Sequence, residues 1–565
     1  MSEEKACDVL VIGSGAGGLT TAITCAHAGL DVIVVEKAPV YGGTTAFSGG
    51  VLWIPGNAYG KEQNPDDTRE LARTYLQVEA GNHFDAEAVD AFLDTGPEAV
   101  EFLERETDVK FVPTLYPDYH PQYEGGVEIG RSILAAPYDT SKLGKDLKRL
   151  RPPLKTITFM GMMFNSSNAD IKHFFNATKS LKSFSYVAKR LVSHATEVLR
   201  FGRGVQVTSG NALAARLAKS TFDLGVPILT ETPARELLRE DGRVIGAVVD
   251  HEGQRLRILA SRAVVIATGG FANDPVRTTE AYSHLRDGGA HFTPVPESVT
   301  GDGITLAEGA GARFDVQFDQ SAAWMPVSKV PMGDGSYKAF PHLLDRYKPG
   351  IVAVNQQGQR FGNESNSYHD VGTTMIETNA GRGTTNAWLI CNRATIRRYG
   401  LGHAKPAPVP LAMYLRNGYL KTGETLDELA SATGIDAEGL RKTVAAYDGP
   451  ASRGEDPEFG RGTTAFNRYL GDPEHKPNPN VAPIGDGPYY ALEIVMGDLG
   501  TFDGLATTTD GKVLDEAGVP IPGLFAVGND RRSVMGGAYP GAGITLGPAL
   551  TFGYLTGKTI SAGSA

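Results

Sequence analysis

This sequence has few cysteines, no long apolar run and no excess of basic residues, and each of these features excludes a class of protein. The three cysteines, Cys7, Cys25 and Cys391, are too few for a disulfide framework or a cysteine-rich metal site, so we expect no metal centre. No apolar run reaches about 18 residues, and the first residues lack the basic and apolar regions of a signal peptide, so we expect a cytoplasmic protein without a membrane span. The 54 Lys and Arg against 65 Asp and Glu give a net charge of -11, which argues against a nucleic-acid partner.

Glycine, by contrast, is abundant. The chain has 69 glycines, about 12% of its residues against a usual share of about 7%. They follow no fixed period, which excludes a collagen-like sequence and predicts many tight turns and close backbone approaches. The length of 565 residues and the 41% hydrophobic content predict a globular protein of two or more domains.

The N-terminal segment places a strand, a glycine-rich turn, a helix and a second strand in close succession. Residues 7–12 (CDVLVI) have the composition of a buried parallel strand, and Gly13, Gly15 and Gly18 follow at once. A helical segment then leads to a second apolar strand that ends at Glu36. In such a unit the first glycine permits the turn, the second lets a pyrophosphate approach the backbone, and the third lets helix and strand pack closely. Because Glu36 can accept a hydrogen bond from a ribose hydroxyl, the pattern predicts a βαβ unit that binds a dinucleotide.

Three further glycine-rich segments favour FAD over NAD as that dinucleotide. Residues 42–57 (GGTTAFSGGVLWIPGN) form a loop that could wrap the pyrophosphate and the flavin, and residues 262–271 and 523–529 each predict a strand that enters a glycine turn. This arrangement resembles the flavoprotein family that contains fumarate reductase, succinate dehydrogenase and the 3-ketosteroid dehydrogenases. The resemblance covers nearly the whole chain.

The resemblance also implies which residues line the FAD. They are Gly13, Gly15, Ala16, Gly18, Glu36, Lys37, Gly43, Thr44, Thr45, Ser48, Gly49, Gly50, Ala234, Gly269, Gly270, Asp302, Gly528, Asn529 and Ile544. Relatives with covalently attached flavin carry a His in the loop after the acidic residue, where this chain has Thr44 and Thr45. Noncovalent FAD is therefore expected.

The same evidence predicts an α/β fold, with a discontinuous Rossmann-like FAD-binding domain and an inserted α+β catalytic or cap domain. We expect the FAD-binding domain to span residues 1–320 and 496–565, with a helical insertion at about 81–205, and the inserted domain to span residues 321–495.

Two local patterns lie within the predicted inserted domain. Residues 351–361 (IVAVNQQGQRF) predict a hairpin of two strands around a Gln-Gln-Gly turn, and residues 425–448 predict two surface helices.

Residues 173–204 combine an apolar helical pattern with a surplus of basic side chains. Apolar residues recur at helical spacing at Phe174, Ala177, Leu181, Phe184, Ala188, Leu191, Ala195 and Val198. The one acid, Glu197, is outnumbered by Lys179, Lys182, Lys189, Arg190, Arg200 and Arg203. We interpret the segment as a core-packed helix with a solvated basic face; peripheral contact with a membrane surface, such as the inner membrane, is the alternative.

The segments that hold a dicarboxylate in fumarate-reducing relatives lack the expected cations. Those relatives carry an Arg about five residues after the Asn of a motif that resembles residues 358–370 (GQRFGNESNSYHD), and Tyr368 stands there instead. The expected His-Thr pair is also absent from residues 497–505. A dianionic substrate needs fixed cations, so a carboxylate substrate is disfavoured but, with Arg531 and Arg532 nearby in sequence, not excluded.

Three tyrosines instead resemble the substrate site of 3-ketosteroid Δ1-dehydrogenase. In that family three tyrosines and one glycine surround the steroid A-ring beside the flavin. Carried over by motif, they fall on Tyr119, Tyr368, Tyr539 and Gly543, with His369 as a competitor for the role of Tyr368.

The resemblance implies FAD-dependent 1,2-desaturation of a 3-ketosteroid. The Tyr539 hydroxyl and the Gly543 N–H would hold the carbonyl oxygen, and Tyr368, as phenolate, would take the C2 proton while hydride leaves C1 for flavin N5. A hydrogen bond from Tyr119 would favour the phenolate and so lower the pKa of Tyr368 from its usual value near ~10. Electrons would pass to a quinone or dye-like acceptor.

Three alternatives stay open at this point. Two are enzymes, a 3-keto-5α-steroid Δ4-dehydrogenase and an ene reductase of the fumarate reductase kind. The third is a flavin-binding protein without turnover.

Overall fold

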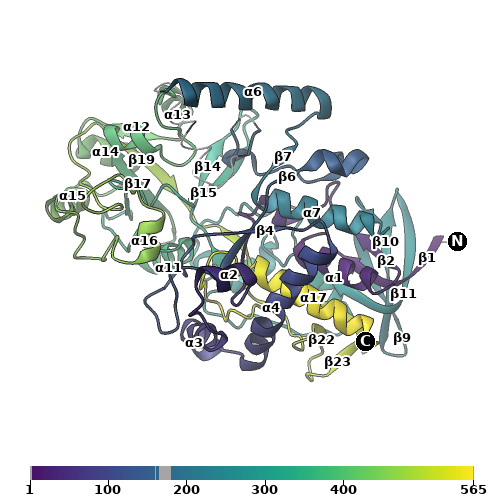
Figure 1. Cartoon of the computed structure of the whole chain (residues 1–565). Helices are drawn as coiled ribbons and strands as arrows, with labels where there is room; N and C mark the ends of the chain where they lie inside the picture. The colour runs from purple at the N-terminus through teal and green to yellow at the C-terminus, as the bar shows by residue number, and fades with distance from the viewer. Residues whose placement is uncertain (1–2, 160, 164–172, 174–179, 564–565) are drawn as a thin grey trace.

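The computed structural model describes residues 3–159, 161–163, 173 and 180–563, and an eight-stranded sheet lies at one end of the molecule (Figure 1). The strand order is β22-β23-β11-β1-β2-β8, and β10 and β9 continue from β11 in antiparallel pairs. The neighbours from β23 to β8 are parallel. The bounds are β1 Glu3–Ile12, β2 Val32–Val35, β8 Ile228–Leu229, β9 Ala234–Glu240, β10 Arg243–His251, β11 Gln254–Ile266, β22 Lys512–Leu514 and β23 Pro520–Ala526. The sheet thus combines the start, the middle and the end of the chain.

A separate antiparallel sheet of four strands, ordered β16-β17-β19-β18, lies at the other end of the molecule (Figure 1). Its bounds are β16 Val352–Val354, β17 Ala387–Asn392, β18 Lys421–Gly423 and β19 Tyr489–Ile494. Smaller sheets are formed by β3 Val51–Trp53, β4 Phe111–Pro113 and β5 Ser132–Ala135, by β6 Tyr138–Asp139 and β7 Gln206–Val207, by β12 Phe314–Asp315 and β21 Gly504–Leu505, by β13 Ala322–Trp324 and β20 Asp498–Thr501, and by β14 Val327–Pro331 and β15 Tyr337–Pro341.

Helices cover the sheets and connect them. They are α1 Ala16–His27, α2 Ala58–Gln63, α3 Arg69–Ala80, α4 Ala86–Glu106, α6 Leu181–Phe201, α7 Ser209–Asp223, α8 Pro275–Ala281, α9 Ser283–Arg286, α10 Asp302–Gly309, α11 Tyr368–Asn379, α12 Arg393–Tyr399, α13 Ala412–Arg416, α14 Leu426–Thr433, α15 Ala437–Ala451, α16 Ala465–Tyr469 and α17 Leu546–Ser561. A short 3₁₀ helix, η1, spans Thr44–Phe47. The predicted helix pair at 425–448 corresponds to α14 and α15.

Strand β1 shows why the central sheet is covered on both faces. Val9 and Val11 lie in one buried cluster, and Leu10 and Ile12 lie in another. Successive side chains of a strand point to opposite faces, so a strand that is apolar throughout needs cover on both sides. The predicted α/β fold class is confirmed, whereas the predicted domain boundaries stay a prediction.

The predicted hairpin at 351–361 is wrong. Only β16 forms there, and it pairs with β17. The Gln-Gln-Gly turn does form, since Asn355 N donates to the Gln359 carbonyl at 2.9 Å, but the chain after it is not a strand. The Arg360 guanidinium in that stretch binds the buried carboxylates of Glu364 and Asp456, and these ion pairs replace a strand ladder.

Helix α6 is not the core-packed helix that the sequence pattern favoured. Of its residues only Ser183 is buried, and Leu181 and Phe184 are exposed, so the described part of this segment is not packed in the core. The predicted positions Phe174, Ala177 and Lys179 lie outside the described residues. In the part of the chain that the structure describes, no helix is both long and apolar enough to cross a membrane.

Candidate active site and cofactor site

Tyr119, Tyr368 and Tyr539 form a buried cluster joined through their hydroxyls. The Tyr119 hydroxyl donates to that of Tyr368 at 3.2 Å, and the Tyr368 hydroxyl donates to that of Tyr539 at 2.6 Å. The ring centroids are 5.7, 5.5 and 5.0 Å apart for the pairs 119–368, 119–539 and 368–539. The exposed fractions of the three residues are 5%, 7% and 3%. The structure therefore brings together the three tyrosines that the sequence motifs singled out.

Backbone hydrogen bonds hold the Tyr119 loop against the segment that carries Tyr539. Tyr119 N donates to the Pro540 carbonyl at 2.8 Å, and the Tyr75 hydroxyl from α3 donates to the same carbonyl at 2.6 Å. Tyr75 in turn accepts from His120 N at 3.2 Å. These contacts connect the backbone of Tyr119 to that of Pro540, the residue after Tyr539.

A buried network of ion pairs and hydrogen bonds contacts the same loop through Asp118. The Trp53 indole donates to Asp118 at 2.8 Å, and Arg131 donates to Asp118 at 2.7 Å and to Asp67 at 2.7 Å. Burial raises the pKa of Asp118 to about 6, although Arg131 acts in the opposite direction. The sequence prediction did not include Asp118. Its place directly before Tyr119 in the motif is the only feature of the sequence that could have suggested a role in positioning that loop.

His120 links the Tyr119 loop to the helix that begins at Tyr368. Its Nδ1 lies 2.6 Å from Glu79 of α3, and its Nε2 lies 3.0 Å from Asp370 of α11. Burial alone would lower the pKa of His120, but the hydrogen bonds with Asp370 and Glu79 raise it to about 11. The imidazolium therefore acts as a cross-link between α3 and α11. No sequence signal marked His120, because its two acids lie 41 and 250 residues away.

The ionisation of the three phenols is governed by burial. Burial raises the pKa of Tyr119 and of Tyr368 well above the usual value, and it raises the pKa of Tyr539 to about 12. The predicted lowering of the Tyr368 pKa by Tyr119 is thus wrong, because burial is the largest effect and the two neighbouring phenols add to it. All three phenols are protonated at neutral pH.

Gly543 lies against the backbone of β3. Its φ is +102°, and a Cβ there would lie 2.5 Å from the Val51 carbonyl oxygen, so only glycine fits. Among the described residues no acceptor is found for the Gly543 N–H, which leaves this donor available.

His369, the competitor for the Tyr368 role, is engaged elsewhere. Its Nδ1 accepts from Trp324 N at 3.2 Å, and burial lowers its pKa to about 4. Its ring centroid lies 5.7 Å from that of Tyr539, but no hydrogen bond joins His369 to the phenol hydroxyls among the described residues. The geometry favours Tyr368.

The glycine turn after β1 has the shape that a dinucleotide requires. A Cβ at Gly13, where φ is +117°, would lie 2.0 Å from the Ala267 carbonyl oxygen, and one at Gly18 would lie 2.4 Å from the Gly13 carbonyl oxygen. Gly15 is the N-cap of α1, and a Cβ there would meet only the Thr45 hydroxyl, at 3.9 Å. The first turn of an α-helix has backbone N–H groups without intrahelical acceptors, so the start of α1 beside this glycine turn suits a pyrophosphate.

The loop at residues 42–50 packs against this turn. Ala16 N donates to the Thr45 hydroxyl at 3.0 Å, and a Cβ at Gly43 would lie 3.5 Å from Gly15 Cα. The Glu36 carboxylate accepts from Ala38 N at 2.9 Å and from the Ser14 hydroxyl at 2.5 Å. Other predicted residues of this loop are Thr44, Ser48, Gly49 and Gly50. Further away, Lys37 pairs with Asp302 of α10 at 2.6 Å, and Ala234 begins β9.

Asp530 joins the two remaining glycine motifs and was not predicted. It accepts from Thr268 Oγ1 at 2.8 Å, from Gly269 N at 2.8 Å and from Gly270 N at 3.3 Å. Burial raises its pKa. Since Asp530 follows Gly528 and Asn529 directly, it fixes both predicted segments to one another. The only feature of the sequence that could have suggested this role for Asp530 is its place directly after the strand and glycine turn at residues 523–529.

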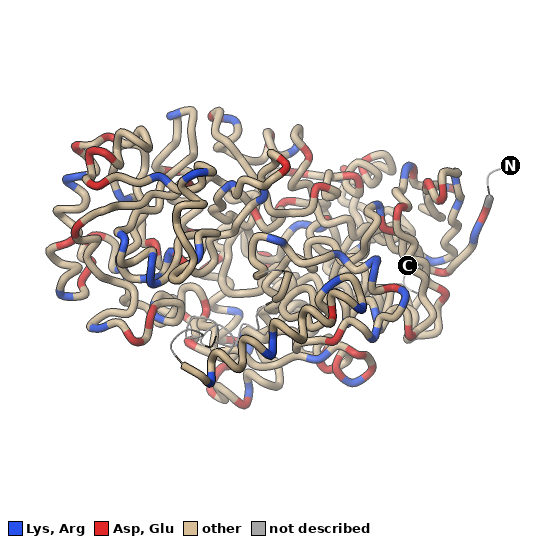
Figure 2. The backbone as a smooth tube through the Cα atoms, turned by 90° about the horizontal axis from the view of Figure 1, so that it is seen from above, with Lys and Arg blue, Asp and Glu red and all other residues tan. Residues whose placement is uncertain are grey.

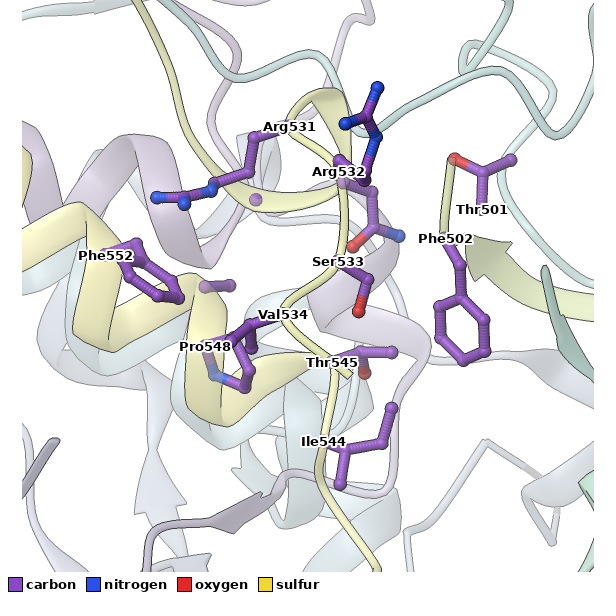
Figure 3. Close-up of a pocket in the computed structure, with 13 residues that line it drawn as sticks. Thr501, Phe502, Arg531, Arg532, Ser533, Val534, Ile544, Thr545, Pro548 and Phe552 are labelled. Carbon is purple, nitrogen blue, oxygen red and sulfur yellow. The ribbon is translucent and has the colours of Figure 1, made fainter. Parts of the chain in front are cut away.

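A pocket lies between these motifs and the start of α17 (Figure 3). Gly528, Asn529 and Ile544 are part of its lining. The Arg531 side chain extends toward Phe552, 3.8 Å from its ring centroid, and away from Phe502. Arg532 binds Asp315 at 3.1 Å. Arg531 and Arg532 thus each have a partner other than the three phenols. The two glycine turns and the start of α1, described above, are the parts of the structure that fit an FAD site.

Comparison with known proteins identifies the family. The profile described as FAD binding domain matches residues 8–546. The chain is 45% identical over 558 residues to 4-oxocyclohex-2-ene-1-carboxylate 5-dehydrogenase of Sinomonas cyclohexanicum, over 98% of this chain and 94% of that protein. It is 38% identical over 576 residues to 3-oxosteroid 1-dehydrogenase of Mycolicibacterium smegmatis (strain ATCC 700084 / mc(2)155), which covers 99% of this chain and 98% of that protein.

A solved structure agrees with these relatives. The crystal structure of 3-ketosteroid delta1-dehydrogenase from Sterolibacterium denitrificans, in complex with 1,4-androstadiene-3,17-dione, matches with a TM-score of 0.89 and 35% identity, over 99% of this chain and 100% of that one. The predicted family and the predicted cofactor, FAD, are confirmed, whereas the contacts assigned to single residues and the noncovalent attachment stay predictions. The chain belongs to the FAD binding domain family and is an FAD-dependent oxidoreductase related to the 3-oxosteroid 1-dehydrogenases.

Proposed function

We propose that the protein desaturates a 3-ketosteroid between C1 and C2. The observation that carries this proposal is the cluster of three buried, hydrogen-bonded phenols, with the Gly543 N–H, four residues after Tyr539, lacking an acceptor among the described residues. Relatives named as 3-oxosteroid 1-dehydrogenases, and the related structure solved with a steroid dienedione, support it.

The proposed role of Tyr539 and Gly543 is to bind the carbonyl oxygen. Two donors aimed at that oxygen stabilise the negative charge that develops when the neighbouring carbon loses a proton. The Thr545 hydroxyl, which hydrogen-bonds to Tyr539, helps to hold the phenol in place.

Tyr368 is proposed to remove the proton from C2, with Tyr119 as its hydrogen-bond partner. The protonated phenol dominates because the pKa of Tyr368 is raised, so the reactive form is the small phenolate fraction. A buried phenolate is a strong base, which offsets its scarcity. Bound FAD supplies the acceptor for the hydride that leaves C1, and a quinone is the proposed final electron acceptor.

A cyclohexenone carboxylate is the second candidate substrate, because a relative is named for it. The relative at 45% identity is named for a cyclohexenone that carries a carboxylate, and it too is a dehydrogenase of a ring ketone. The same phenols and the same N–H would serve that ring. We place the steroid first because Arg531 and Arg532, the cations near the pocket, bind Phe552 and Asp315 rather than the phenols.

Product analysis separates the two substrates. Purified protein is incubated with 4-androstene-3,17-dione or with 4-oxocyclohex-2-ene-1-carboxylate and an artificial electron acceptor, and the products are identified by mass spectrometry and NMR. The proposal expects a 1,4-diene-3-one from the steroid. Turnover of the cyclohexenone carboxylate alone would assign the second function, and turnover of neither would refute both.

A further inference from the structure

Helix α6 turns its apolar stripe to solvent rather than to the protein. Leu181, Phe184, Val192 and Leu199 are 84%, 60%, 65% and 87% exposed. An amphipathic helix of a globular protein normally directs such a stripe into the core. Contiguous exposed apolar surface of this kind marks an interaction site.

The spacing shows that these residues form one continuous surface. With the small residues Ala188 and Ala195, they recur at intervals of three or four residues from Leu181 to Leu199. Positions three and four apart lie on the same side of a helix. The stripe therefore runs the whole length of α6.

A row of cations borders the stripe on one side. Lys182, Lys189 and Arg200 each follow a residue of the stripe directly in sequence, and each is exposed. A step of one residue rotates by about 100° around a helix, so the three lie along the same flank.

The only acid of α6 is turned toward the protein. One oxygen of Glu197 accepts from Val205 N at 2.9 Å, and the other accepts from the Ser193 hydroxyl at 3.1 Å. Glu197 is partly buried, whereas the three cations of the flank are exposed. The exposed surface of the helix is thus apolar and positive, although the whole chain carries a net charge of -11.

The position of α6 suits a flat partner. Figure 1 shows it along the upper edge of the molecule, with no other described element above it. Figure 2, viewed from above, shows Lys and Arg mixed with Asp and Glu over the rest of the described chain. None of the described elements therefore blocks a planar surface from approaching α6.

We propose that α6 docks the protein on an anionic lipid surface. Its apolar stripe would enter the boundary between headgroups and acyl chains, and the flank of Lys182, Lys189 and Arg200 would lie against lipid phosphates. A helix with an apolar face and a Lys- and Arg-rich polar side is the kind that lies in this interface. This inference does not depend on the substrate of the enzyme.

The test uses the holoenzyme and vesicles of phosphatidylcholine with about one-third phosphatidylglycerol, in a sedimentation assay. Wild-type protein is expected to sediment with these vesicles at low salt and to be released at high salt. Vesicles of phosphatidylcholine alone should retain much less. No sedimentation with anionic vesicles at low salt would overturn the proposal.

Two variants and a control connect the binding to α6. Replacing Lys182 and Lys189 with Gln should weaken binding about 25-fold, or about fivefold for each charge. Replacing Leu181 and Leu199 with Gln should abolish it. Val276→Gln on α8, also an exposed apolar residue at 73%, should bind as the wild type does. Unchanged flavin absorbance shows that each variant is folded.

Unaltered binding by both α6 variants would place the lipid contact elsewhere and refute the proposal. Light scattering in the absence of lipid tests the alternative that a second copy of this chain binds the apolar stripe. A dimer that becomes monomeric in the Leu181 and Leu199 variant would mean that a second copy of the chain covers the stripe, and this too would overturn the lipid assignment.

Discussion

At the residue scale, the proposed chemistry depends on three phenols that are joined by hydrogen bonds, from Tyr119 to Tyr368 and from Tyr368 to Tyr539. Two of them have a pKa raised well above the usual value and the third has a pKa of about 12, with burial as the largest cause in each case. The site is therefore full of neutral hydrogen-bond donors, which suits a neutral carbonyl better than a carboxylate. The same burial makes the proposed base scarce in its reactive form.

The pH dependence follows from that scarcity. The phenolate fraction of Tyr368 grows about tenfold for each pH unit below its pKa. The single-turnover rate of flavin reduction should therefore rise from pH 6 to pH 9 without reaching a plateau. His369, with a pKa of about 4, and His120, with a pKa of about 11, change little in this range. A rate that is level from pH 6 to pH 9 would argue against a tyrosine base.

At the element scale, a few contacts set the relative positions of helices and turns. His120 connects α3 to α11, and the glycine turn connects β1 to α1. The three phenols come from a loop at Tyr119, from α11 at Tyr368 and from the loop before α17 at Tyr539, so their relative positions depend on such contacts.

Gly13→Ala should prevent flavin retention. The added methyl group would lie 2.0 Å from the Ala267 carbonyl oxygen, at a φ of +117°. We expect a loss of stability of about 1–3 kcal/mol, and a purified protein with little bound flavin, as measured by absorbance. Gly449→Ala in α15 is the control, because a Cβ there meets nothing within 4 Å, and it should keep its flavin.

His120→Gln should destabilise the protein in a pH-dependent manner. The pKa of His120 is raised from 6.5 to about 11, so the folded state favours the imidazolium. This stabilisation is complete below pH 6.5 and is lost as the pH rises toward about 11. The difference in free energy of unfolding between wild type and variant should be largest at pH 6 and should decrease toward pH 10. A difference that does not vary with pH would show that His120 acts through packing alone.

At the scale of the whole molecule, the proposed cofactor site combines segments from the start, the middle and the end of the chain. Asp530 accepts hydrogen bonds from Gly269 N and Gly270 N, and α17 lines the pocket together with Ile544. A ligand that contacts all of these segments stabilises the folded chain as a whole.

Removal of FAD should therefore lower the melting temperature. A ligand at about 100 times its Kd stabilises the folded state by about 2.7 kcal/mol, so flavin-stripped protein should melt several degrees below the holoenzyme in calorimetry. Addition of FAD should restore the original value. Equal melting temperatures would contradict a site built across these segments.

The sequence could predict the elements whose signals are local. The glycine turn, Glu36 and the helices at 425–448 follow from patterns within about 30 residues, and the tyrosines follow from family motifs. It could not predict the partners that only folding brings together. Arg360 pairs with Asp456 across 96 residues, which replaces the expected hairpin, and His120 reaches Asp370 across 250 residues. The exposure of α6 was likewise hidden, because periodicity shows that a helix has an apolar face but not what covers it.

The central claim is that the phenols and the Gly543 N–H activate a ketone beside the flavin. The most direct test is anaerobic stopped-flow reduction of the enzyme-bound FAD by 4-androstene-3,17-dione in wild type, Tyr539→Phe and Tyr368→Phe. We predict rapid bleaching of the wild-type flavin and a rate about 100- to 1,000-fold lower in Tyr539→Phe, the usual cost of one oxyanion donor. A still slower rate is expected in Tyr368→Phe, with normal flavin content in both variants. Bleaching at the wild-type rate in either variant would contradict the account.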